Sequence, residues 1–394
     1  MSTVPARAAR ALALLGLVCA LCACSSVKEL ISRESSNAIA PTPLAEDFKP
    51  TIQVDSLWSK RIGKGSDQHY LKLTPIVADG TLFVADRHGH LIATELESGK
   101  VLWQIEDETV QYTGGPGSGD GMVLIGTGDG RVIAREADSG KLRWVAKVSS
   151  EVLAAPRARD GVAVVRTGDG RLYGLAAETG KQLWEFERTV PTLTLRGIAA
   201  PVIDEDLVFA GFDNGRLVAV HLHSGKQIWD SPLAVPSGRS DLERMVDVDA
   251  EPVVVGTSVY VASFQGGVAA LSIVDGQIEW NREISSYDEI AVGAGHVYVT
   301  DEEGVVWALN RETGASVWKQ EALANRFVTG PTYFDGHIVV GDFEGYAHWL
   351  DAQTGELQFR TQIDKTRIIS PALVASDRIL IYSAEGRLVA MRPH

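Results

Sequence analysis

The chain has 394 residues and a formal net charge of −14, with 51 acidic against 37 basic side chains. This balance argues against a nucleic-acid partner, because phosphate binding needs a basic field. The length would suit two or three ordinary domains, although a repeat array could fill it as one unit. Glycine is abundant, and helix-period stretches are scarce beyond about residue 40. Composition therefore favours a β-rich protein.

Residues 1–23 have the pattern of a signal peptide. Arg7 and Arg10 give a positive start, and residues 11–18 form an apolar run too short to span a bilayer. We therefore expect export from the cytoplasm and removal of this segment.

The signal ends in Leu-Cys-Ala-Cys at residues 21–24, which resembles the bacterial lipobox. Lipoprotein processing requires a thiol at the cut site, so Cys24 is the expected lipid attachment site. The alternatives are an ordinary signal peptide or acylation of Cys22. All three cysteines precede Ser25, so the mature chain would have neither a disulfide nor a cysteine nucleophile. Serine after the lipid site is usual for lipoproteins of the outer membrane.

Residues 24–50 are polar and contain several serines and prolines, which predicts a lipidated N-terminal tether. A repeated phrase then occupies residues 51–394. Each copy has a turn glycine followed four residues later by a large aromatic. The pairs are Gly99 and Trp103, Gly140 and Trp144, Gly180 and Trp184, Gly225 and Trp229, Gly276 and Trp280, Gly314 and Trp318, and Gly355 and Phe359.

Successive aromatics are 41, 40, 45, 51, 38 and 41 residues apart. A period near 40 residues with about four short strands is typical of a β-propeller. The last unit begins at Pro371 and ends at His394 without its tryptophan strand. Residues 52–58, which end in Trp58, match the missing strand. The sequence predicts an all-β, eight-bladed propeller of four-stranded antiparallel blades, with the N-terminal strand closing the last blade and the tryptophans packed between blades.

Two neighbouring units are longer than the others, with extra sequence at residues 188–197 and 232–249. In a repeat array, insertions become loops on one face, which is often the face used for binding. Because the two units are consecutive, these loops could lie side by side.

The inserted sequences contain side chains suited to a protein contact. Leu193 and Leu195 alternate along the chain, and Arg196 adds a planar set of donors. Asp247 and Asp249 alternate in the same way in the second insertion. We interpret these residues as one docking patch. The alternative is two solvated loops whose leucines pack locally.

Two His-x-His pairs, His88 with His90 and His221 with His223, could each offer two metal ligands from one side of a strand. No third ligand is visible, and the first pair occupies turn positions that suggest exposure to solvent. We expect no metal site, and no catalytic motif stands out.

The lipobox, the tryptophan repeat, Leu-x-Leu-Arg-Gly and Glu-Arg-x-x-Asp-Val-Asp together resemble the BamB family of the outer-membrane β-barrel assembly machinery. The resemblance covers essentially the whole chain. It implies a non-catalytic scaffold without a cofactor, lipid-anchored on the periplasmic side of the cell outer membrane. It also implies binding to the POTRA domains of BamA, help in assembling and inserting β-barrel proteins, and contact with nascent outer-membrane proteins. The implied BamA-contact residues are Leu193, Leu195, Arg196, Asp247 and Asp249.

The tryptophan repeat is also similar to that of quinoprotein dehydrogenases, which are periplasmic eight-bladed propellers that use pyrroloquinoline quinone (PQQ) and Ca²⁺. Many of those enzymes carry an adjacent cysteine pair, which the mature chain lacks, and they are usually much longer. A PQQ-dependent dehydrogenase is therefore the alternative function. A propeller lipoprotein of another envelope complex is a third.

Overall fold

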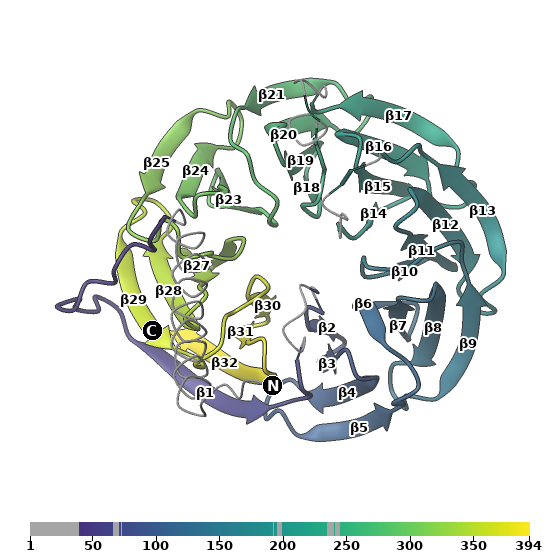
Figure 1. Ribbon diagram of the computed structural model, residues 1–394, viewed down its shortest axis with the longest axis horizontal. Helices are drawn as coiled ribbons and strands as arrows, with labels where there is room; N and C mark the ends of the chain where they lie inside the picture. Colours follow the sequence, from purple (N-terminus) through teal and green to yellow (C-terminus); the bar gives the residue numbers. More distant parts are fainter. Residues whose placement is uncertain are drawn as a thin grey trace, which may run out of the picture. The chain divides into compact units, whose positions relative to one another are not determined.

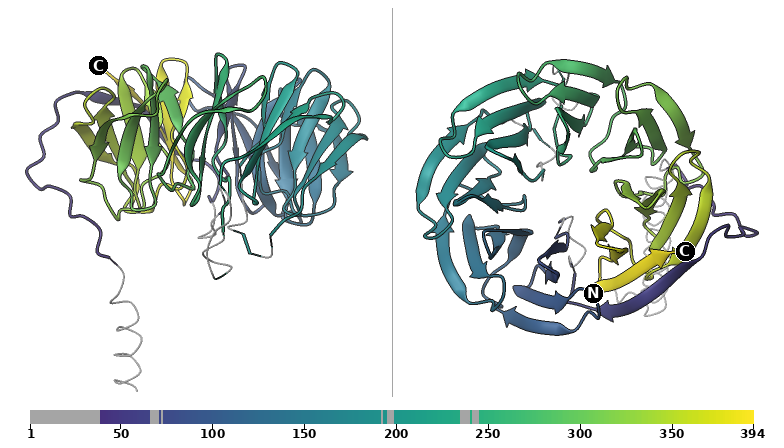
Figure 2. Two further views of the ribbon diagram at one scale, coloured as in Figure 1. Left: turned by 90° about the horizontal axis from the view of Figure 1, so that it is seen from above. Right: turned by 180° about the vertical axis from the view of Figure 1, so that it is seen from behind.

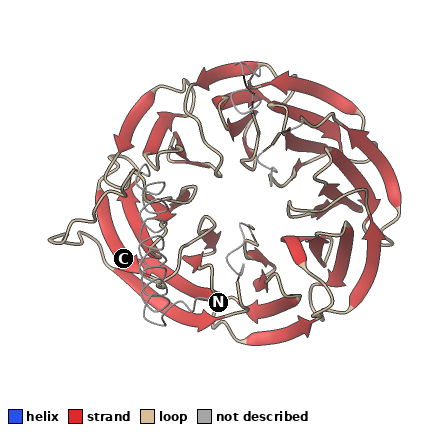
Figure 3. Cartoon of the chain, in the orientation of Figure 1, coloured by secondary structure: helices blue, strands red, loops and turns tan. Residues whose placement is uncertain are grey.

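The computed structural model describes residues 39–65, 71, 73–191, 193–194, 199–234, 240 and 245–394. Across these residues the chain forms 32 β-strands in eight four-stranded antiparallel sheets, and the part described contains no helix (Figure 3). The sheets are arranged radially around a central axis as the blades of a propeller (Figure 1). The predicted eight-bladed architecture is confirmed.

Blades are numbered here in chain order, each from its inner to its outer strand. Blade one consists of β2 (Ile76–Ala78), β3 (Thr81–Ala85), β4 (His90–Glu95) and β5 (Val101–Glu106), and blade two of β6 (Tyr112–Gly119), β7 (Met122–Thr127), β8 (Arg131–Glu136) and β9 (Leu142–Lys147). Blade three consists of β10 (Arg157–Arg159), β11 (Val162–Arg166), β12 (Arg171–Ala176) and β13 (Gln182–Glu187), and blade four of β14 (Val202–Asp204), β15 (Leu207–Phe212), β16 (Arg216–His221) and β17 (Gln227–Pro232). Blade five consists of β18 (Val253–Val255), β19 (Ser258–Ser263), β20 (Gly267–Ser272) and β21 (Ile278–Arg282), and blade six of β22 (Ala291–Gly293), β23 (His296–Thr300), β24 (Val306–Asn310) and β25 (Ser316–Gln320). Blade seven consists of β26 (Thr332–Phe334), β27 (His337–Gly341), β28 (Tyr346–Asp351) and β29 (Leu357–Gln362), and blade eight of β30 (Leu373–Ala375), β31 (Arg378–Tyr382), β32 (Arg387–Pro393) and β1 (Val54–Arg61).

The eighth blade joins the two ends of the propeller sequence. β1 pairs antiparallel with β32, from Val54 opposite Pro393 to Arg61 opposite Arg387, and the two lie side by side in Figure 1. The N-terminal strand therefore supplies the outer strand of the last blade, as predicted. This pairing closes the ring and leaves no blade incomplete.

Strand direction gives the ring two different faces. Because neighbouring strands in a blade are antiparallel, the hairpin between the second and third strands lies at the same end as the connection to the next blade. We call this end the connection face and the opposite end the turn face. Figure 2 shows the ring edge-on, with connecting segments at both ends of the strands. Both sequence insertions are blade-to-blade connections, so both lie on the connection face.

Burial follows the radial position of each strand. β11, a second strand, is buried at every residue, as expected for a strand covered on both faces by neighbouring blades. β9, an outer strand, alternates between buried and exposed residues at its C-terminal end, because one side faces the neighbouring blade and the other faces solvent.

The repeated tryptophan joins each blade to the next. The indole Nε1 of Trp184 in β13 donates to the carbonyl oxygen of Leu222 in blade four at 2.7 Å. Its ring covers Gly225, where a Cβ atom would come within 2.6 Å of the indole and where φ is +64°. A glycine is needed there for both reasons. The same indole bond recurs from Trp58 to Leu96, Trp103 to Ala137, Trp144 to Ala177, Trp229 to Ile273, Trp280 to Arg311 and Trp318 to Ala352.

The repeat has Phe359 where blade seven meets blade eight. Blade eight is the place where the chain begins and ends, so it has no hairpin between its third and outer strands. The phenylalanine ring has no N–H group, so this junction lacks the indole hydrogen bond of the other blades.

The unit that contains the propeller begins at Thr42, earlier than the tether boundary expected at residue 50. Residues 42–51 lie against blade seven. Within the described residues there is no helix long and apolar enough to cross a membrane.

Candidate protein-docking face

The first inserted connection runs from β13 to β14 and starts from a fixed base. The backbone N–H of Arg188 donates to Gly170 O at 2.9 Å, and its guanidinium donates to Gln227 Oε1 at 2.6 Å and pairs with the Asp230 carboxylate. Asp230 also binds Arg216 on the neighbouring strand. The start of the connection is therefore tied to the outer part of blade four.

Beyond this base the connection displays an apolar side chain. Leu193 is 43% exposed, so it offers apolar area at the surface of this connection. Ala199 and Ala200, where the chain returns to the ring, are buried. Leu195 and Arg196 lie outside the described residues.

The second inserted connection returns to the ring between blades four and five. Val246 pairs with Asn214 in a parallel bridge, and the Val248 N–H donates to Phe212 O at 3.3 Å. The N–H of Phe264 in blade five donates to Asp247 O at 2.8 Å. Residues 245–250 are thus backed by hairpins of two blades.

Both predicted aspartates are buried in this return segment. Asp247 is 0% exposed and Asp249 is 4% exposed, and the valine between them is fully buried as well. The sequence interpretation placed their side chains on a contact patch with Leu193, but the structure puts them beneath the surface. The alternation of residues along the sequence carried no information about burial, and all three residues from 247 to 249 are buried.

A buried ion pair missed by the sequence interpretation supports this region. Arg166 in blade three pairs with Asp213 in blade four, and their side chains are only 3% and 5% exposed. The guanidinium also lies 5.7 Å from the Phe212 ring centroid. The available sequence signal was an arginine ending the otherwise apolar strand β11. The pair joins the two hairpins beside the inserted connections.

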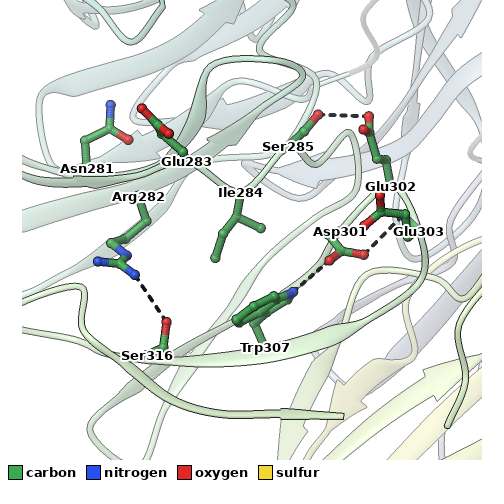
Figure 4. A pocket seen from close by; sticks show the side chains of 10 residues that line it. All are labelled: Asn281, Arg282, Glu283, Ile284, Ser285, Asp301, Glu302, Glu303, Trp307 and Ser316. Atoms are coloured by element: carbon green, nitrogen blue, oxygen red, sulfur yellow. Dashed lines mark hydrogen bonds between the residues drawn. The ribbon is translucent and has the colours of Figure 1, made fainter. Parts of the chain in front are cut away.

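The connection face also carries a pocket of about 610 Å³ between blades five and six. Glu283, Glu302 and Glu303 line it together with Trp307, and all four are labelled in Figure 4. The indole donates to Asp301 Oδ2 at 2.7 Å, and Ser285 Oγ donates to Glu302 Oε2 at 3.1 Å. The carboxylates of Asp301 and Glu302 thus accept hydrogen bonds from other side chains of the pocket lining.

A smaller, more apolar pocket of about 310 Å³ lies on the same face, lined by the connections that enter blades six, seven and eight. Phe327 borders it, is 76% exposed and packs edge-on against Phe343 at 6.2 Å between centroids. Sequence reasoning missed this residue, although an aromatic in a loop that departs from the repeat was visible.

Comparison with known proteins gives the family. A family model described as "Outer membrane protein assembly factor BamB" matches residues 106–320 and 317–394. A curated protein of that name from Alkalilimnicola ehrlichii is 42% identical, over 97% of this chain and 97% of its own length. The chain belongs to the BamB family of outer-membrane protein assembly factors.

Solved structures agree with this membership. The crystal structure of BamB from Moraxella catarrhalis superposes with a TM-score of 0.79 at 28% identity, over 86% of this chain and all of the other. A quinohemoprotein alcohol dehydrogenase from Pseudomonas putida superposes with a TM-score of 0.68 at 14% identity, over 89% of this chain and 78% of the enzyme. The second likeness shows a shared propeller fold only.

The quinone alternative would need a cavity suited to the cofactor, and the central channel of this BamB-family chain is one cavity that could hold it. The channel pocket, of about 400 Å³, is lined mainly by prolines and small apolar residues, and its Arg157 and Glu251 pair with each other at 3.1 Å. The described residues contain no group of three or more acidic, histidine or cysteine side chains placed to hold a metal. This lining does not fit a quinone with Ca²⁺.

The two His-x-His pairs differ in their exposure to solvent. His90 is 9% exposed and its Nδ1 lies 2.6 Å from Asp86 Oδ2, so the expected solvent exposure is wrong for this residue. The Asp86 carboxylate also accepts hydrogen bonds from the backbone N–H groups of His88 and His90 in the same hairpin. His223 is exposed, and its ring lies 6.0 Å from that of His221.

Proposed function

We propose that this chain is a non-catalytic scaffold that binds the POTRA domains of BamA through its connection face. The observation that carries the proposal is the pair of inserted connections. They interrupt an otherwise regular ring in consecutive blades, both lie on one face, and the first displays Leu193 from a base fixed by Arg188. A partly exposed leucine beside a hydrogen-bonded base offers apolar area that a partner can bury.

The proposal gives the five predicted contact residues two kinds of role. Leu193, Leu195 and Arg196 contact the partner, with apolar area from the leucines and charge-assisted hydrogen bonds from the arginine. Asp247 and Asp249, which are buried, position the second connection behind them. Substitution of an aspartate should therefore lower both stability and binding, whereas substitution of Leu193 should lower binding alone.

The proposal places the protein at the periplasmic side of the outer membrane, held by lipid on Cys24. Its task there is to help β-barrel proteins assemble and insert, with nascent outer-membrane proteins as further partners. Neither catalysis nor a cofactor is part of this role.

Cross-linking in intact envelopes followed by pull-down tests the proposal. With a photoreactive residue at Leu193, we expect the main adduct to contain BamA. The same residue at Val274, which is 73% exposed on the turn face, is the control and should give no such adduct. An equal yield of BamA from both positions would rule out the proposed face.

A Cys24→Ala variant should lose membrane attachment, and a cleaved variant that stays membrane-bound would refute the lipid site.

A further inference from the structure

Residues 42–51 lie along the outside of the ring on the outer strand of blade seven. The Thr42 N–H donates to Ala324 O at 3.0 Å, on the connection face. Nine residues later the Thr51 N–H donates to Gln358 O at 2.9 Å, near the start of β29. The segment therefore crosses from the connection face to the turn face before entering β1, a course that is visible in Figure 2.

Two arginines of the ring hold this segment by its carbonyl groups. Arg326 donates to Thr42 O at 3.1 Å, while its other nitrogens bind Asp342 Oδ2 at 2.9 and 2.7 Å. Arg326 is only 3% exposed, and its two hydrogen bonds to Asp342 fix the orientation of the guanidinium. The bond to Thr42 is charge-assisted and partly buried, and a charge-assisted hydrogen bond is stronger than a neutral one.

The second arginine, Arg360 of β29, forms the middle contact. It donates to Ala45 O at 2.8 Å, and its guanidinium lies 5.1 Å from the Phe48 ring centroid and 5.8 Å from that of Tyr346. An arginine between two rings, one from the segment and one from the blade, holds them together by cation–π attraction. Leu44 adds apolar contact with the core between blades six and seven.

Burial of the underlying strand shows what the segment covers. In β29 five of six residues are half-buried and one is exposed, whereas in β5, the equivalent strand of blade one, four of six are exposed. An outer strand presents unpaired backbone groups, which proteins commonly cover to prevent unwanted pairing.

We infer that residues 42–51 form a brace, docked on β29 by Arg326 and Arg360, which makes the anchor-bearing segment leave the ring on the connection face. Without the brace, that segment would leave from the start of β1, on the turn face. The eighteen positions from Cys24 to Thr42 extend at most about 60 Å. If Cys24 carries lipid and the connection face binds the partner, as proposed above, the brace keeps the anchor's exit and the docking face on the same side of the ring.

The brace is tested by distance measurement on the mature chain with Cys24→Ser, which contains no other cysteine. Spin labels are placed by Glu46→Cys, in an exposed part of the brace, and by Val274→Cys on the turn face of blade five. Double electron–electron resonance should give one narrow distance distribution. Arg360→Ala combined with Phe48→Ala should replace it with a broad one, and Arg131→Ala, a half-exposed arginine of blade two, should leave it narrow.

Hydrogen exchange gives a second readout. Protection of the Thr42 and Thr51 amides should be lost in the double variant while β32 keeps its protection, which shows that the propeller remains folded. If that variant fails to fold, Leu44→Ser serves in its place. A broad distribution in the unmodified brace, or a narrow one in the folded variants, would overturn the inference. Loss of partner binding with an intact brace would instead count against the proposed function alone.

Discussion

The tryptophan that joins consecutive blades makes a quantitative prediction at Trp184. Its side chain is 7% exposed and donates to Leu222 O across the interface between blades three and four. Trp184→Ala would remove a large buried side chain and leave a cavity, at a cost of about 3–5 kcal/mol. Trp184→Phe would keep part of the packing but lose the hydrogen bond, so about 1–3 kcal/mol is expected.

Urea unfolding followed by circular dichroism measures these losses as shifts of the midpoint. Leu183 on the same strand is the matched control, because it is 53% exposed and Leu183→Ala should change stability by less than about 0.5 kcal/mol. Equal midpoints for Trp184→Ala and Leu183→Ala would refute the claim that the repeated indole joins the blades.

Two further predictions concern buried charge. Asp213→Ala removes the carboxylate that neutralises buried Arg166, and a loss of about 3–5 kcal/mol is expected; the double variant Asp213→Leu, Arg166→Met should recover most of it, and no recovery would contradict the ion-pair explanation. Burial lowers the pKa of His348 below its ordinary value of 6.5, an effect that its hydrogen bond to Asp342 only partly offsets. As the pH falls below about 6.5, His348 is therefore protonated in the unfolded chain before it is protonated in the folded chain. Each pH unit below that value should lower the free energy of unfolding by up to about 1.4 kcal/mol. His348→Gln should flatten the pH dependence of the urea midpoint between pH 6.5 and 5, and an unchanged slope would show that another group dominates.

The fold was predictable because its determinants recur. Each unit must place a glycine under the indole of the preceding blade, as Gly225 does under Trp184, so the pattern appears at every period. Strand closure was predictable for the same reason, since Trp58 marks an outer strand that has no partner nearby in sequence.

The site was less predictable because its determinants are single and distant. The segment that carries Asp247 and Asp249 is hydrogen-bonded to hairpins of two blades, and no local pattern reports them. The brace resembled a spacer because its prolines and polar residues do not alternate. The arginines that hold it are 284 and 315 positions away from their acceptors, a separation that one sequence cannot relate.

Binding of the purified chain to the isolated POTRA domains of BamA tests the central claim most directly. Leu193 is 43% exposed in the free protein, and burial of that remaining area is worth about 1 kcal/mol. Leu193→Ala should therefore raise the dissociation constant about fivefold without changing the urea midpoint. Leu183→Ala, on the outer strand of blade three, should leave the dissociation constant unchanged. Titration by isothermal calorimetry measures both, and the account would be contradicted if Leu193→Ala bound as tightly as the unmodified chain.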